Sequence, residues 1–149
     1  MHQVYQQGEF EVSTDPARLD VEAIHQFLAH ESYWAQGVDR AVQAKALANS
    51  LNFGLYAGPR QIGLARVVTD YATYAYLCDV YVHADFRGRG LGQWLMSCLV
   101  AHPELQGVRR FSLVTRDAHG LYAQFGWTAL ARPERHMERL PANYYQQVG

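Results

Sequence analysis

The spacing of apolar residues predicts four helices, because apolar side chains recur every three to four positions in four segments of the chain. In the first, Val21, Ile24 and Leu28 share one face, and Asp20 precedes them as an N-cap. The other three are expected from 38 or 39 onward, over 90–102 and over 118–125. Their expected inward positions include Val42, Ala46, Leu47, Leu91, Leu95, Cys98 and Leu99. Asp117 is expected to cap the last helix, and Gly126 to end it.

Runs rich in Val, Ile, Tyr and Phe predict strands between these helices. The expected strands cover residues 10–12, 51–57, 61–68, 73–82, 108–114 and 127–130, and residues 137–140 could form a last edge strand. Gly58-Pro59 marks a turn between two of them. This order of elements predicts an α/β fold of the α+β type, in which helices cover both faces of a mixed sheet.

Bulk properties narrow the class of protein. The 149 residues suit one domain, and 49% hydrophobic with 18% charged residues is typical of a folded globular protein. A net charge of −1 argues against a nucleic-acid or anionic-membrane surface, and no apolar run reaches membrane-spanning length. The N-terminus lacks the apolar core of a signal peptide. We therefore expect a cytoplasmic protein with reduced core thiols at Cys78 and Cys98 and no metal site.

A glycine loop separates the strand at 73–82 from the helix that follows it. The loop and the first helical residues read Arg87-Gly88-Arg89-Gly90-Leu91-Gly92. Backbone N–H groups and a helix N-terminus meet at this point, which attracts phosphate, and glycine allows close approach to the backbone. No Lys follows the glycines, so the loop is not a Walker A motif, and their spacing also excludes the G-x-G-x-x-G dinucleotide fingerprint.

The remaining pattern, Arg87-x-x-Gly90-x-Gly92, resembles the pyrophosphate loop of the GNAT superfamily of acetyl-CoA-dependent N-acetyltransferases. A second motif lies further along, at Ala118, Leu121, Tyr122, Gly126 and Trp127, and resembles the second signature of that superfamily. The match covers about residues 60 to 130. It implies a mostly antiparallel sheet whose two central strands, 73–82 and 108–114, run parallel and splay apart to admit the cofactor.

The resemblance implies that acetyl-CoA is the co-substrate. Residues 87–92 would cradle its pyrophosphate, and the exposed backbone of Val80, Tyr81 and Val82 would pair with the pantetheine arm as an added strand. A backbone N–H near Val80 or Tyr81 would polarise the thioester carbonyl. The family often has Asn seven residues before its catalytic Tyr, and this chain has Thr115 there, which puts the exact pantetheine contacts in doubt.

Tyr122 fills the position of the family's catalytic Tyr, which makes it the candidate general acid. An ordinary phenol pKa of about 10 exceeds the roughly 8.5 of a thiol, so the phenol would be protonated when the thiolate leaves. Asp79, a carboxylate inside the central strand, is the candidate base. The alternative, which the residue pattern favours, is a structural Asp paired with a basic residue such as Arg66. His83 and His119 could relay a proton.

The acceptor site is expected between the first two helices, where the loop carries Tyr33 and Trp34. Tyr76 on the central strand would add a third aromatic wall, which suits a small amine through cation–π contact. Core packing is the alternative for these rings. We expect a small-molecule or amino-acid-like primary amine as the partner. A protein lysine or N-terminal acceptor, or an acyl-CoA sensor without turnover, stays open, as does a homodimer.

Overall fold

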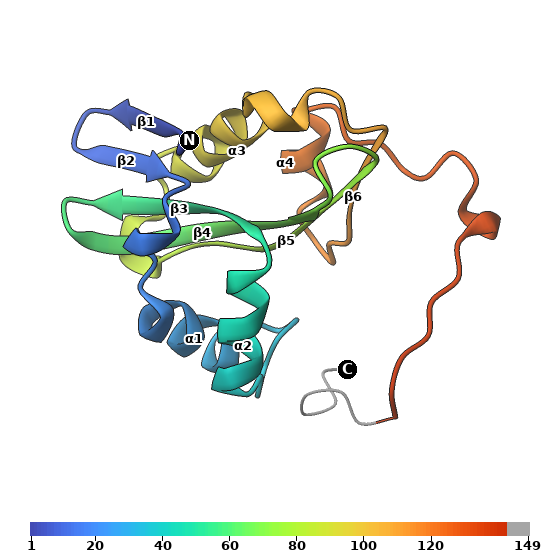
Figure 1. The fold of residues 1–149 in the computed structure, drawn as a ribbon, viewed down its shortest axis with the longest axis horizontal. Helices are drawn as coiled ribbons and strands as arrows, with labels where there is room; N and C mark the ends of the chain where they lie inside the picture. The colour runs from blue at the N-terminus through green and yellow to red at the C-terminus, as the bar shows by residue number, and fades with distance from the viewer. Residues whose placement is uncertain (143–149) are drawn as a thin grey trace.

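The described part of the computed structural model, residues 1–142, forms a six-stranded sheet with strand order β1-β2-β3-β4-β5-β6 (Figure 1). The strands are β1 Val4–Gln7, β2 Phe10–Ser13, β3 Leu51–Ala57, β4 Arg60–Thr69, β5 Tyr74–Val82 and β6 Arg110–Leu113. The helices are α1 Val21–His30, α2 Arg40–Ala48, α3 Leu91–Val100 and α4 His119–Ala123. No helix within 1–142 has the length and apolar character needed to cross a membrane.

All neighbouring strands pair antiparallel except β5 and β6, which pair parallel from Tyr74↔Arg110 to Leu77↔Leu113. β5 continues to Val82, but the pairing ends at Leu77, so the two strands separate over the second half of β5. The expected fold is therefore confirmed: a mixed, mostly antiparallel sheet with a splayed parallel pair.

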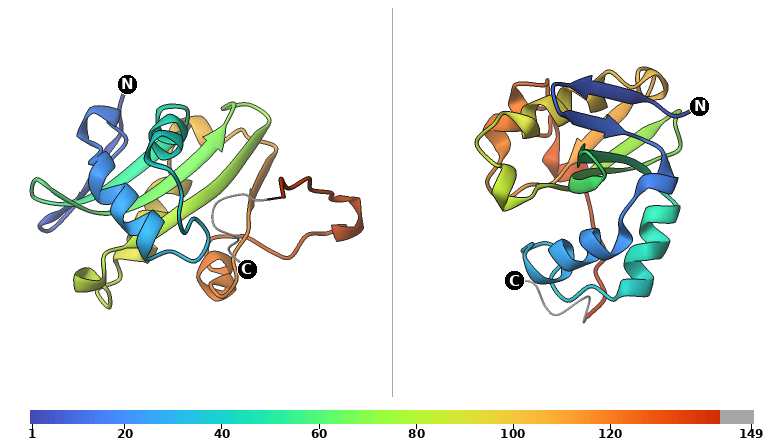
Figure 2. Two further views of the ribbon diagram at one scale, coloured as in Figure 1. Left: turned by 90° about the horizontal axis from the view of Figure 1, so that it is seen from below. Right: turned by 90° about the vertical axis from the view of Figure 1, so that its left-hand side faces the viewer.

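Helices cover both faces of the sheet, with α1 and α2 on one side and α3 and α4 on the other (Figures 1 and 2). The apolar stripe of α3 is buried as expected, at Leu91, Leu95, Cys98 and Leu99. The N-cap expected for α1 is also confirmed, since Asp20 accepts a hydrogen bond from the Ala23 backbone N–H at 3.0 Å. The inward position expected for Val42 on α2 is wrong, because that side chain is exposed and Gln43 is buried in its place.

The strand β1 was not expected from the sequence. It pairs with β2 through a turn at Gly8, which has a φ of 59°. Only Tyr5 of its four residues is partly shielded from solvent, because β1 is an edge strand. An edge strand of this kind buries too little apolar surface to leave an alternating pattern in the sequence.

The strands expected at 127–130 and 137–140 are absent from the described residues, which leaves β6 at the edge of the sheet. Trp127 lies against β6 and donates a hydrogen bond from Nε1 to the Phe111 carbonyl at 2.9 Å. Beyond about residue 131 the chain, drawn in red, runs away from the sheet (Figure 1). We call residues 132–142 the C-terminal arm.

Candidate active site

The glycine loop presents free backbone N–H groups at the start of α3. Gly88 and Gly90 have φ values of 80° and 73°, a left-handed conformation that side chains other than glycine rarely adopt. Gly90 is the N-cap of α3 and contributes no side-chain hydrogen bond, so the first N–H groups of the helix remain available to a ligand. Arg87 turns back and donates from Nε to the Val82 carbonyl at 2.9 Å.

The second half of β5 offers an unpaired backbone edge. Within residues 1–142 it has no strand partner on the β6 side beyond Leu77, and the register with β4 slips so that Asp79 and Val80 oppose one residue. At this bulge Asp79 has a φ of 53°, which a non-glycine residue seldom adopts. The Tyr81 ring stacks on Phe27 in the core, with ring centroids 4.0 Å apart, so only the Tyr81 backbone can meet a ligand.

A central cleft of about 620 Å³ lies between β5, the start of α4 and the loop that follows α1. Its lining includes the expected catalytic residues Tyr122 and Asp79 and the expected acceptor residues Tyr33, Trp34 and Tyr76. Two of the expected cofactor-binding residues, Val80 and Thr115, line it as well. The residues that line the cleft come from segments that lie far apart in the sequence. The glycine loop does not line it and lies beyond the far end of β5.

Tyr122 is buried on α4 at the wall of the central cleft. Burial raises the pKa of its phenol above the ordinary value of 10.0. The local turn that places it differs from the one expected. Ala118 occupies the N-cap position, and Thr115, not Asp117, accepts the Ala118 backbone N–H through Oγ1 at 3.1 Å. Thr115 therefore helps to fix the start of the helix that carries Tyr122.

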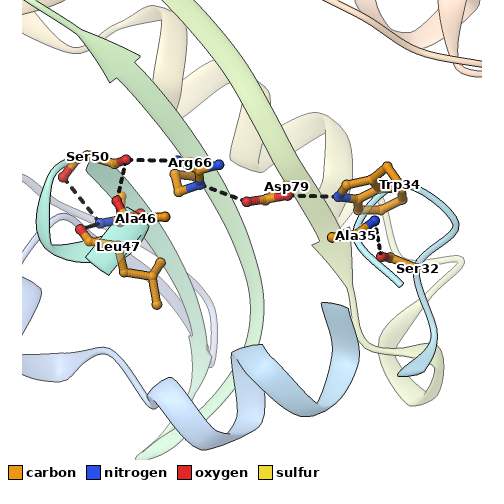
Figure 3. Close-up of polar contacts among 9 residues, drawn as sticks. Ser32, Trp34, Ala35, Ala46, Leu47, Ser50, Arg66 and Asp79 are labelled. Carbon is orange, nitrogen blue, oxygen red and sulfur yellow. Dashed lines mark hydrogen bonds and ion pairs between the residues drawn. The ribbon is translucent and has the colours of Figure 1, made fainter. Parts of the chain in front are cut away.

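Asp79 is held at the floor of the central cleft by two side chains (Figure 3). The Trp34 indole donates to Oδ1 at 2.8 Å, and Arg66 donates from Nε to Oδ2 at 2.7 Å. Arg66 also donates to the Ser50 hydroxyl at 3.0 Å. The Arg66–Asp79 ion pair is largely buried, with side-chain exposures of 17% and 8%. Such an arrangement orients Asp79 and ties the Trp34 loop to the sheet.

Tyr33 and Trp34 form one aromatic corner of the central cleft, with their rings edge-to-face at 5.1 Å. The Tyr33 hydroxyl accepts the Arg116 backbone N–H at 3.0 Å, and the Arg116 guanidinium lies 3.8 Å from the Tyr33 ring centroid. These contacts connect the loop after α1 with the loop after β6. Both loops contribute residues to the lining of the cleft.

The structure adds cleft residues that the sequence did not single out. Gln43 and Val42 of α2 line the cleft, as do Glu138 and Leu140 of the C-terminal arm. Neither expected histidine lines it. His83 caps a short turn by accepting the Asp85 backbone N–H at 3.2 Å, and His119 faces the groove beside β6. Within residues 1–142 no cluster of three metal-ligating side chains occurs.

Comparison with known proteins decides the family. The model of the Acetyltransferase (GNAT) family matches residues 21–127. The chain belongs to the GNAT family of acetyltransferases. A candidate acetyltransferase of Gibberella zeae is 36% identical over 145 residues, which cover 82% of this chain and 80% of that protein. The GNAT family uses acetyl-CoA as its co-substrate, so the glycine loop and the open β5 edge have a ligand of matching chemistry.

Solved structures agree with this assignment. A candidate GNAT acetyltransferase from Xanthomonas campestris superposes with a TM-score of 0.88 at 47% identity, and the match covers 91% of this chain and 96% of that chain. A GCN5-related N-acetyltransferase from Ralstonia eutropha superposes with a TM-score of 0.60 at 19% identity, covering 83% of this chain and 93% of that chain. The second likeness shows the fold alone.

Proposed function

We propose that this GNAT protein transfers the acetyl group of acetyl-CoA directly to the primary amine of a small molecule. The observation that carries the proposal is the position of Tyr122, which is buried in the wall of the same central cleft that Asp79 lines. A phenol in that place serves as the acid for a thiolate that leaves from the unpaired edge of β5.

The co-substrate would be held at two places. Backbone N–H groups of residues 87–92 and the N-terminus of α3 suit the pyrophosphate, since they supply donors and the positive end of a helix dipole. The unpaired edge of β5 at Val80 to Val82 suits the two amides of pantetheine, which would pair with it as a strand does. An N–H of this edge, near Val80 or Tyr81, would polarise the thioester carbonyl.

In the reaction the amine nitrogen attacks the thioester carbon, the carbon–sulfur bond breaks, and an amide forms. The Tyr122 hydroxyl would give its proton to the departing thiolate. Because burial raises the Tyr122 pKa, the phenol stays protonated at neutral pH. The amine proton would leave to water in the cleft. Both Asp79 oxygens already accept hydrogen bonds, so Asp79 fits the role of orienting Trp34 better than that of a direct base.

The cleft favours a compact acceptor. Tyr33, Trp34 and Tyr76 line it, and aromatic rings of this kind would favour an ammonium group before it deprotonates. Asp117 and Glu138 add carboxylates at its lining. A small amine with an apolar body fits these walls, whereas a folded protein surface would meet the C-terminal arm at Glu138 and Leu140 first.

A panel of primary amines and short lysine peptides tests the proposal. Purified protein is incubated with acetyl-CoA and each compound, free thiol is followed with a thiol reagent, and products are identified by mass spectrometry. Thiol release that depends on a small amine, with one acetyl group added to that amine, supports the proposal. Acetylation of the peptides alone would replace the small-molecule acceptor with a protein one. Binding of coenzyme A without release for any compound would contradict turnover.

A further inference from the structure

A buried glutamine of α2 lines the central cleft, and the proposed reaction does not use it. Gln43 is only 3% exposed, and it shares the inner face of α2 with Leu47. The other residues that α2 contributes to the cleft, Val42 and Ala46, are apolar. The Gln43 amide is therefore a single polar spot in the part of the cleft wall that this helix forms.

The Gln43 side chain has no hydrogen-bond partner within residues 1–142. Its amide is also not sealed from solvent, because the sealed and unpartnered side-chain atoms of the described residues belong to Asn52 and Tyr56. A glutamine amide carries two N–H donors and an oxygen that accepts, and buried polar groups in proteins are nearly always hydrogen-bonded. We therefore expect the partner of Gln43 to come from the cleft.

A second buried glutamine shows the opposite arrangement. Gln61 is 6% exposed, and both ends of its amide are used. Its Oε1 accepts the Asp20 backbone N–H at 2.7 Å, and its Nε2 donates to the Gly63 carbonyl at 3.0 Å. These bonds tie the start of α1 to β4, so Gln61 has a structural role. Gln43 makes no such tie, although it is buried to a similar degree.

The charges in the cleft favour a neutral partner for Gln43. Within residues 1–142, the two cations of the lining already lie beside carboxylates: Arg66 is 2.7 Å from Asp79, and Arg116 is 3.8 Å from Asp117. A carboxylate bound at Gln43 would leave water for a neutral amide, which is costly. A carboxamide avoids that cost, because it is neutral and has a donor and an acceptor that match those of glutamine.

We propose that Gln43 determines acceptor specificity, and that the acceptor is a primary amine carrying a carboxamide. The carboxamide oxygen would accept from Gln43 Nε2, and a carboxamide N–H would donate to Gln43 Oε1. The apolar body between the two ends would lie along Val42 and Ala46, and the amine would reach the wall formed by Tyr122. This inference rests on the proposed acetyl transfer, since both use the same cleft.

Acceptors of matched length test the proposal. Initial rates of thiol release give kcat/KM for ω-amino carboxamides, ω-amino carboxylates and alkylamines with equal carbon chains. The wild type should prefer the carboxamides by about tenfold or more over both other series, because an analogue that lacks the group leaves Gln43 unpaired. Gln43→Leu keeps a similar volume without the amide, and its preference should fall below about threefold. Gln61→Leu should retain the wild-type preference, because Gln61 does not line the cleft.

Urea unfolding without any ligand separates specificity from folding. Gln61→Leu should lower the midpoint of unfolding, because it removes two internal hydrogen bonds, whereas Gln43→Leu should leave the midpoint equal or higher. A loss for Gln43→Leu as large as that for Gln61→Leu would overturn the proposal, since it would give Gln43 a structural role. Equal use of carboxamides and alkylamines by the wild type, or a preference for carboxylates, would also overturn it.

Calorimetry distinguishes a failure of this inference from a failure of the proposed function. The same ω-amino carboxamides and alkylamines are titrated into the protein saturated with coenzyme A, which supports no transfer. Tighter binding of the carboxamides that is lost in Gln43→Leu supports the role of Gln43, even if acetyl-CoA gives no thiol release. Equal binding of the two series by the wild type would overturn that role, even if acetyl transfer to amines is observed.

Discussion

Asp79 combines an unusual backbone conformation with a buried ion pair. It has a φ of 53° at the bulge where the register of β5 with β4 shifts, and its two oxygens accept hydrogen bonds from Trp34 and Arg66. Strain of this kind persists only where surrounding contacts fix it. The bulge, the cleft floor and the aromatic loop after α1 are therefore held by one side chain.

Replacing Asp79 tests this structural role through the free energy of unfolding. Asp79→Ala removes both hydrogen bonds and the carboxylate of the buried ion pair with Arg66, and it puts Ala at a positive φ, so we expect a loss of about 3–5 kcal/mol in the free energy of unfolding. Asp79→Asn tolerates the conformation and keeps an acceptor for Trp34, so its loss should be clearly smaller. Urea unfolding measures both. Both variants remove the charge, so equal losses would mean that the left-handed conformation and the acceptor for Trp34 contribute nothing measurable.

Single residues were predictable where a motif names them. The glycines of residues 87–92 lie at the start of α3 and Tyr122 lies on α4, as the element order predicted, and their roles in binding and catalysis stay predictions. The partners of Asp79 were only half predictable. Arg66 is a neighbour across a strand pair and was expected, whereas Trp34 comes from a loop 45 residues away. Gln43 and Glu138 carry no local signal, since only the folded chain brings them to the cleft.

Among the elements, the junction of β5 and α3 depends most on backbone conformation. Gly90 caps α3 with a φ of 73°, while the next glycine, Gly92, lies inside the first helical turn without a positive φ. Gly90→Ala should therefore destabilise the fold by roughly 1–2 kcal/mol. Gly92→Ala should be neutral or stabilise by up to about 1 kcal/mol, because Ala favours the helix and its Cβ meets open space.

Thermal or urea unfolding of the two variants makes the comparison direct, since each adds one methyl group in the same loop. A loss for Gly92→Ala as large as that for Gly90→Ala would show that crowding, and not the left-handed conformation, governs this junction.

The elements themselves followed the sequence where periodicity was strong. The strands β3, β4 and β5 and the helices α1 and α3 were predicted within a few residues, because each buries a regular apolar stripe. The prediction failed at both ends of the sheet. β1 lacks an alternating pattern, and the stretches 127–130 and 137–140 have strand character without a strand partner in the described residues.

The whole molecule should lose stability in alkaline solution. Burial raises the pKa of the Cys78 thiol from 9.0 to about 12 and that of the Tyr56 phenol from 10.0 to about 12. A raised pKa in the folded state means that the stability from these neutral groups is complete below pH 9 and declines as the pH rises toward 12. The free energy of unfolding should therefore be level from pH 7 to 8.5 and fall above pH 9.

Comparing Cys78→Ala with the wild type measures how much of this alkaline loss of stability comes from the Cys78 thiol. One such group accounts for up to about 1.4 kcal/mol per pH unit, so the variant should decline less steeply between pH 9 and 10 than the wild type, with reductant present in both. Parallel curves for the two proteins would contradict the assignment of that decline to Cys78.

At the scale of the whole molecule, the proposed reaction requires that the splayed strands of the GNAT fold bring Tyr122 and the open edge of β5 to one cleft. The most direct test compares amine-dependent thiol release by Tyr122→Phe and Tyr5→Phe, where the second makes the same chemical change on β1. We expect Tyr122→Phe to lower kcat by about 10²- to 10⁴-fold while coenzyme A binding, measured by calorimetry, stays within twofold. Tyr5→Phe should keep both the kcat and the coenzyme A affinity of the wild type. Unchanged turnover in Tyr122→Phe would contradict the assigned role of the phenol.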